Sequence, residues 1–127
     1  MKEIIAMHGW AGGGDQWSNW INSFQSSNWT WHSADRAYRD STPSMPNWTK
    51  ISDSKRFIRV AICHSLGSHL IANKVLSEAT HIVLINSFSS FLPSGKESRS
   101  IIVALNGMMQ AIGTEKENSM ILKFHIK

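Results

Sequence analysis

The chain is predicted to fold as an α/β domain with a mostly parallel sheet. Short, nearly continuous apolar runs alternate with segments of helical length, which is the pattern of strand–helix–strand units. Continuous apolar runs, in place of strict alternation, are typical of strands that are covered on both faces. Such parallel strands are joined by right-handed crossovers. The expected strands are residues 2–7, 28–32, 57–63 and 81–86.

The first expected helix covers residues 16–25, with Asp15 as its N-cap. Its apolar residues recur at i, i+3, i+4 and i+7 and so form one face. These residues are Trp17, Trp20, Ile21 and Phe24. A second helix is expected over residues 66–79. Its inward stripe is Ala72, Val75, Leu76 and Ala79.

The polar segment 33–54 carries two prolines and is expected to be mainly loop, with a short helix near residues 48–54. After Phe88 the pattern changes to two consecutive helices, at 99–112 and 115–124, with no strand between them. Two helices in this position are typical of a lid. We therefore expect a core over residues 1–88 and the start of a helical lid over residues 89–127.

Size and composition limit the class of protein. At 127 residues, with 42% apolar and 17% charged residues, the chain is expected to be globular and to form at most one domain. No apolar run approaches the ~20 residues that a membrane helix needs, and the N-terminus shows no export signal, so we expect a cytoplasmic protein without a membrane partner. The net charge is +4 and the basic residues are scattered, which disfavours nucleic-acid binding. A single cysteine excludes an internal disulfide and a cysteine metal cluster, and neither a metal nor a cofactor is expected.

The segment that carries chemistry is Cys63-His64-Ser65-Leu66-Gly67, directly after an apolar run and before a helical pattern. A serine on a tight strand-to-helix turn has an exposed hydroxyl, as an acyl-transfer nucleophile requires. The adjacent Leu66 amide, at the start of a helix, is expected to donate to the oxyanion. A second donor is expected from the Trp10 amide, in the glycine-rich loop that follows the first strand. The neighbouring thiol of Cys63 is a less favoured alternative nucleophile.

These motifs, His8-Gly9-Trp10 and Cys63-His64-Ser65-Leu66-Gly67, resemble the oxyanion loop and nucleophile elbow of the α/β-hydrolase superfamily. Within it the chain looks most like the biotin-pathway carboxylesterases, which cleave the methyl ester of pimeloyl-acyl carrier protein. The resemblance implies the front half of a three-layer α/β/α fold with the start of a helical lid.

For activity, the resemblance implies an acyl-enzyme formed on Ser65, with the oxyanion held by the amides of Trp10 and Leu66. The acyl chain would lie against Trp10, Met108 and Met109. The basic lid residues would either meet an acidic carrier protein or form a solvated helical face. These are Lys96, Arg99 and Lys116.

The chain departs from the family pattern in two ways. Cys63 stands where glycine is usual, and no histidine or acid can be matched to the triad partners that the family places after later strands. The alternative is therefore a truncated or split, non-catalytic fragment, with a complementing chain that supplies both groups. Among the local histidines, His8 and His64 match structural positions of the family, and His125 is the terminal candidate for the base.

A third possibility is a ligand-binding α/β domain that uses the glycine loop for phosphate. The loop lacks the Lys-Ser/Thr end of a P-loop and has Trp17 where the dinucleotide spacing requires glycine. This possibility is accordingly the weakest of the three.

Overall fold

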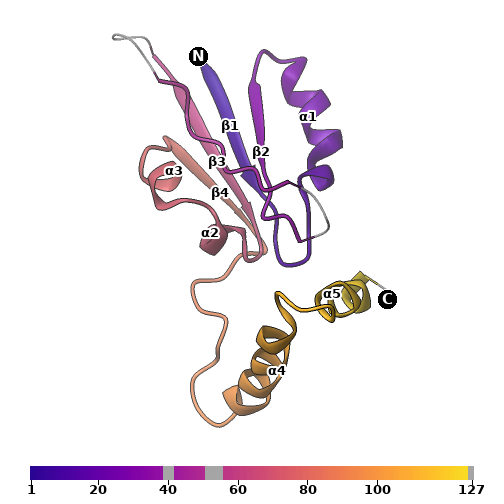
Figure 1. Cartoon of the computed structure of the whole chain (residues 1–127). Helices are drawn as coiled ribbons and strands as arrows, with labels where there is room; N and C mark the ends of the chain where they lie inside the picture. The colour runs from indigo at the N-terminus through magenta and orange to yellow at the C-terminus, as the bar shows by residue number, and fades with distance from the viewer. Residues whose placement is uncertain (39–41, 51–55, 126–127) are drawn as a thin grey trace. The chain divides into compact units, whose positions relative to one another are not determined.

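The computed structural model describes residues 1–38, 42–50 and 56–125, which fall into two compact units, Met1–Ser87 and Phe88–Lys127. The first unit contains a parallel sheet and short helices, and the second contains two helices (Figure 1). In chain order the elements of the first unit are β1 (Lys2–Met7), η1 (Gly14–Trp17), α1 (Ser18–Gln25), β2 (Thr30–Ala34), β3 (Ile58–His64), α2 (Gly67–Leu70), α3 (Asn73–Ser77) and β4 (His81–Ile85).

The sheet confirms the predicted α/β class. Its four strands are all parallel and lie in the order β2-β1-β3-β4. Strand β1 is central because its buried residues Ile4–Met7 pair on both sides, with β2 and with β3. All four strands therefore end at the same edge of the sheet, and the loops that follow them share that edge.

Helices cover both faces of the sheet. On one face, Trp17 of η1 packs with Ile4 and Ile62, together with partly buried residues of α1. On the other face, Ile71 and Val75 from the α2–α3 region pack on Ile5 and Met7. Trp48 completes this second cluster and donates a 2.9 Å hydrogen bond from Nε1 to the Val75 carbonyl.

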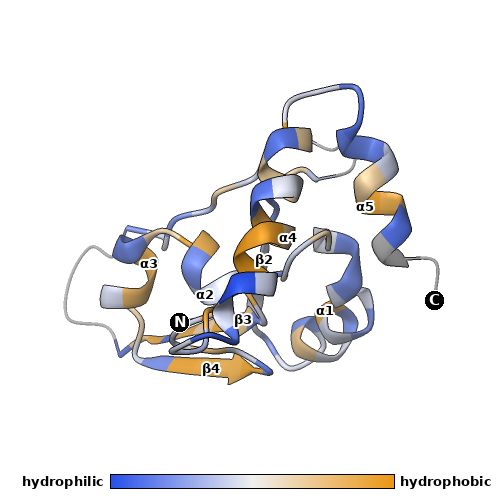
Figure 2. Cartoon of the chain, turned by 90° about the horizontal axis from the view of Figure 1, so that it is seen from below, coloured by the Kyte–Doolittle hydropathy of each residue, from blue (hydrophilic) through white to orange (hydrophobic). Residues whose placement is uncertain are grey.

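Strand β4 is covered least. It is the edge strand of the sheet, and Ile82, Val83 and Leu84 are 50%, 40% and 60% exposed. From the register, Ile82 and Leu84 lie on the face of Cys63, and Val83 lies on the face of Ile62. Figure 2 shows β4 as a strongly apolar strand. Apolar side chains are thus exposed on both faces of the edge strand.

Two helix predictions are wrong in detail. The chain after the glycine loop starts as a 3-10 turn at Gly14, so Asp15 lies inside η1, and the N-cap position is taken by Gly13. The helix expected over 66–79 is two short helices, because Ile71 and Ala72 have extended backbone with ψ of 148° and 134°. The break places Ile71 in the core and leaves Ala72 exposed.

Other boundaries shift by small amounts. The second strand begins at Thr30 and ends at Ala34, two residues beyond the expected end. Of the short helix expected near 48–54, residues 48–50 are not helical, and the rest lies outside the described residues.

The second unit contains α4 (Ser98–Ala111) and α5 (Glu117–His125), close to the two helices expected after Phe88. No helix in the described ranges is both long enough and apolar enough to cross a bilayer.

Candidate active site

The carboxyl edge of the sheet concentrates backbone strain. Each strand is followed within four residues by a non-glycine residue with a left-handed backbone. These residues are Ala11 after β1, Ala37 after β2, Ser65 after β3 and Asn86 after β4, with φ of 56°, 63°, 52° and 48°. This conformation costs about 1–2 kcal/mol for a residue with a side chain. Strained residues cluster at functional sites, and in α/β sheets ligands bind at this edge.

Ser65 lies on the sharp turn that the sequence predicts, immediately after β3. Its amide donates a 2.8 Å hydrogen bond to the carbonyl of Ile85, at the end of β4. Ser87 Oγ, just beyond, donates to the carbonyl of Cys63 at 3.2 Å. The turn that carries Ser65 is therefore held between the ends of two neighbouring strands.

The glycine loop after β1 closes on this turn. A Cβ added to Gly9 would lie 2.9 Å from Ser65 Cβ and 3.1 Å from the carbonyl oxygen of His64. A Cβ on Gly67 would lie 2.6 Å from the Met7 carbonyl oxygen. Both positions therefore require glycine for close approach, and together they bring the two predicted motifs into contact.

The two predicted oxyanion donors, the amides of Leu66 and Trp10, lie in different surroundings. Leu66 immediately precedes α2, and among the described residues no carbonyl accepts a hydrogen bond from its N–H. A helix dipole was expected from the sequence to help stabilise the oxyanion. Since α2 has only four residues, this stabilisation would come from the local N–H groups. Trp10 follows Gly9, and its ring packs edge-on against Tyr38 at a centroid distance of 4.9 Å.

His8 is fully buried behind the loop, where both ring nitrogens have neighbours. Nδ1 lies 2.7 Å from the Gly9 carbonyl oxygen, and Nε2 lies 3.0 Å from the Arg36 amide nitrogen. Nε2 is also 3.3 Å from Asp35 Oδ1. Both ring nitrogens of His8 are therefore occupied by contacts with the two loops, and the buried ring is not available as a base for Ser65.

Asp35 is the residue at this edge that the sequence analysis missed. It follows β2 directly and accepts hydrogen bonds from the amides of Gly14 at 2.9 Å and Ala37 at 2.7 Å. Burial alone would raise the pKa of its carboxyl, but these two hydrogen bonds and the nearby His8 outweigh burial and lower the pKa. No clear signal in the sequence marked this residue, because the expected strand ended at residue 32, three residues before Asp35.

The described residues place no base beside Ser65, the predicted nucleophile. Among the described residues, no group accepts a hydrogen bond from Ser65 Oγ. His64 Nδ1 lies on the Gly9 side of the turn, 3.3 Å from the position of a Gly9 Cβ. His32 lies within β2 beside Glu3, which corrects the expectation that it ends that strand. The side chain of His125, the terminal candidate, lies outside the described residues.

Cys63 is buried beneath the turn, and burial raises the pKa of its thiol to about 11. At neutral pH only about one molecule in 10⁴ would carry a thiolate. The alternative of a thiol nucleophile is therefore disfavoured.

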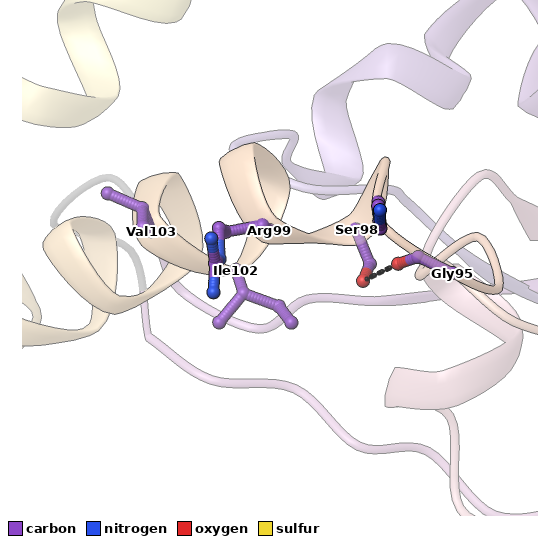
Figure 3. A pocket seen from close by; sticks show the side chains of 6 residues that line it. Gly95, Ser98, Arg99, Ile102 and Val103 are labelled. Atoms are coloured by element: carbon purple, nitrogen blue, oxygen red, sulfur yellow. Dashed lines mark hydrogen bonds between the residues drawn. The ribbon is translucent and has the colours of Figure 1, made fainter.

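The predicted substrate-contacting residues Met108 and Met109 lie in α4, within the second unit, and Met109 is largely exposed. A hollow of about 630 Å³ in that unit is formed by other residues near the start of α4 (Figure 3). Its lining consists of Gly95, Lys96, Ser98, Arg99, Ile102 and Val103.

Within the described part of the chain, no three histidine, cysteine or acidic side chains are grouped as metal ligands. Comparison of the chain with protein-family models, with curated proteins and with solved structures gives no match. The fold and the site therefore define a small α/β domain with a four-stranded parallel sheet and a strained serine at its carboxyl edge.

Proposed function

We propose that the chain is a serine hydrolase of the α/β-hydrolase type that acts on a carboxylic ester. One observation carries the proposal: Ser65 projects from a left-handed turn after a parallel strand, and the glycine loop approaches it so closely that a Gly9 Cβ would lie 2.9 Å from Ser65 Cβ. This is the arrangement that an exposed nucleophile and nearby amide donors require.

In the proposed reaction, Ser65 Oγ attacks the ester carbonyl while its proton passes to a base. The amides of Leu66 and Trp10 hold the resulting oxyanion. The base returns the proton to the departing alcohol, and water then attacks the acyl-enzyme to release the acid and restore the serine. By resemblance to the biotin-pathway carboxylesterases, the narrower proposal is the methyl ester of pimeloyl-acyl carrier protein, in the cytoplasm, with Trp10 beside the acyl chain.

The rate depends on where the base comes from. In a well-studied serine protease, loss of the base costs about 10⁶ in turnover, and ~10³–10⁴ over water remains from the oxyanion hole and binding. Since the described residues place no base on Ser65, we expect the chain alone to be nearly inactive as an esterase.

A fluorophosphonate probe tests the proposal. We expect slow labelling of the purified chain at Ser65, identified by mass spectrometry of the modified peptide, and no labelling of that peptide in Ser65→Ala. Ser68→Ala is the matched control, because this serine lies in α2 three residues away. Labelling that persists in Ser65→Ala would overturn the proposal. Rapid labelling of the isolated chain would show that a base is present.

A split or non-catalytic form of the same fold is the second candidate. It is favoured by the exposure of apolar residues on both faces of β4, since an added strand with its own helices would cover them. A strand added parallel to β4 would also deliver its following loop to the edge that carries Ser65.

The nucleotide sequence downstream of the codon for Lys127, translated in all frames, distinguishes the two candidates. A frame that encodes a strand followed by Asp, and then a strand followed by His, would favour the split form. If no frame encodes such a segment, the downstream sequence does not encode a complementing chain, and this outcome would count against the split form.

A further inference from the structure

The loop after β2 holds the glycine loop after β1 at both of its ends. At the distal end, the amide of Gly14 donates to Asp35 Oδ2 at 2.9 Å. At the proximal end, the amide of Arg36 donates to His8 Nε2 at 3.0 Å. Asp35 also accepts from the Ala37 amide at 2.7 Å, and this bond fixes the backbone that presents the Arg36 amide.

The Arg36 contact favours one tautomer of His8. The backbone N–H of Arg36 can only donate and lies 3.0 Å from Nε2, whereas the Asp35 carboxylate, which can only accept, lies 3.3 Å from the same nitrogen. The shorter contact favours Nε2 as an acceptor, and the ring proton then lies on Nδ1. Nδ1 in turn donates to the carbonyl of Gly9 at 2.7 Å. The imidazole is completely buried, so water does not compete for either nitrogen. His8 therefore connects the loop after β2 to one particular peptide group of the glycine loop.

That peptide group contains the Trp10 amide. The Gly9 carbonyl and the Trp10 N–H belong to one planar trans unit, in which the two bonds point in opposite directions. The Gly9 carbonyl is held by His8 and by the Gly12 amide at 3.2 Å. Fixing this carbonyl fixes the direction of the Trp10 N–H.

We infer that Asp35 is a positioning residue: by holding Gly14 and the backbone around Arg36, it sets the direction of the Trp10 amide through His8. The catalytic meaning of this inference rests on the proposed function, in which the Trp10 amide is an oxyanion donor. The placement of the loop by Asp35 does not depend on that function.

The test uses the full chain with Asp35→Ala and Asp35→Asn. The asparagine variant retains one acceptor oxygen and the side-chain shape, so it remains informative if Asp35→Ala fails to fold. Asp15→Asn is the matched control, because it removes the same charge from an exposed position in the same region. Three quantities are measured: amide hydrogen exchange at Trp10 and Gly14, the ¹⁵N shifts of the His8 ring, and the rate of fluorophosphonate labelling at Ser65.

For Asp35→Ala we expect exchange at Trp10 and Gly14 to rise at least about tenfold, with the amides of β1 and β3 unchanged. The His8 nitrogens should leave the pattern of a single Nδ1–H tautomer, and Ser65 labelling should slow by about tenfold to a hundredfold. Asp35→Asn should fall between this variant and the wild type, and Asp15→Asn should match the wild type. A merely structural role would lower stability without a selective change at His8 and Trp10.

Unchanged exchange at Trp10 in folded Asp35 variants would overturn the inference. So would increased exchange with an unaltered Ser65 labelling rate, because the loop would then not serve the serine. If the wild-type chain is never labelled, the proposed function fails, and hydrogen exchange with the His8 shifts still decides whether Asp35 places the loop.

Discussion

The two ends of the parallel sheet hold an acidic side chain in different ways. At the carboxyl end, Asp35 is partly buried, accepts hydrogen bonds from two backbone amides and lies beside His8. At the amino end, Glu3 is 1% exposed and accepts hydrogen bonds from the hydroxyl and the amide of Thr49. Its other oxygen lies 3.9 Å from Arg59 Nε.

The amino end is built from opposite charges and packing. Arg59 also lies 3.5 Å from Glu78, donates to the Thr49 carbonyl at 2.7 Å and stacks over the ring of Phe57. At the amino end one described residue with a side chain, Asn28 before β2, has a positive φ, whereas four such residues follow the carboxyl ends of the strands. The comparison indicates that ion pairs and packing stabilise the amino end, and that backbone strain is concentrated at the carboxyl end, where the proposed site lies.

Replacing Glu3 with Gln should have the largest effect on stability. The substitution leaves the Arg59 guanidinium, only 11% exposed, without its buried counter-charge. We expect a loss of about 2–4 kcal/mol in the free energy of unfolding, measured by urea denaturation. Glu78→Gln is the control, because Glu78 is 40% exposed and should cost less than about 1 kcal/mol. Equal losses from the two variants would contradict a stabilising role for the buried pair.

Gly67→Ala should have the next largest effect on stability. Its Cβ would meet two backbone carbonyl oxygens, of Met7 at 2.6 Å and of His8 at 2.9 Å, neither of which can rotate away. We expect α2 to shift and the free energy of unfolding to fall by about 1–3 kcal/mol. In the interior of α4, a Cβ on Gly107 would meet nothing within 4 Å. Gly107→Ala should therefore raise the helix content, measured by circular dichroism. A lower helix content would contradict the expectation that α4 accepts an added methyl group at this position.

Ser65 offers a test of strain at the carboxyl end. Because its φ is 52°, Ser65→Gly should be more stable than Ser65→Ala by about 1 kcal/mol, although neither variant can be labelled. At Ser68, inside α2, the order should reverse, with glycine less stable than alanine by about 0.5–1 kcal/mol. Thermal denaturation of the four variants gives both differences. The same order at both positions would remove the argument for a strained nucleophile.

Titration of Cys63 should not change stability at neutral pH, and its effect should appear only at high pH. The folded thiol keeps its proton up to about pH 11, whereas an exposed thiol releases it near 9.0. The unfolded state therefore loses this proton first, and the stability contributed by the protonated thiol falls as pH rises from about 9 to about 11. Cys63→Ala should show a flatter stability profile in this range. Rapid alkylation of the native thiol at pH 8 would contradict its burial.

Three of the four strands were predictable to within one residue because each contains a short, nearly continuous apolar run, whereas β2, which is mixed in composition, lies two residues beyond its predicted bounds. Lys2–Met7 is predicted to the residue, and β3 and β4 differ from their predicted ends by one residue. Helical structure after Ser65 was predicted, but its break into α2 and α3 was not predictable, because the apolar pattern continues through Ile71 and Ala72. There, burial of Ile71 against the sheet outweighs the helical preference of the segment.

The site was predictable in part for a similar reason. Ser65 and Gly9 stand in motifs whose spacing places them at strand ends, and the structure brings them together. Asp35 lies in a polar segment without periodicity, where no sequence pattern distinguishes it from the other acidic residues. Its importance depends on contacts with Gly14 and His8, which are 21 and 27 residues away along the chain.

The hydrogen bond between the Ser65 amide and the Ile85 carbonyl connects the proposed nucleophile to the least covered strand of the sheet. A molecule that extends the sheet alongside β4 would stiffen that carbonyl and, with it, the bend that presents the hydroxyl. Conversely, fraying of β4 would release the bend before the centre of the sheet is affected. The proposed reactivity of Ser65 is thus expected to depend on whether this edge is occupied.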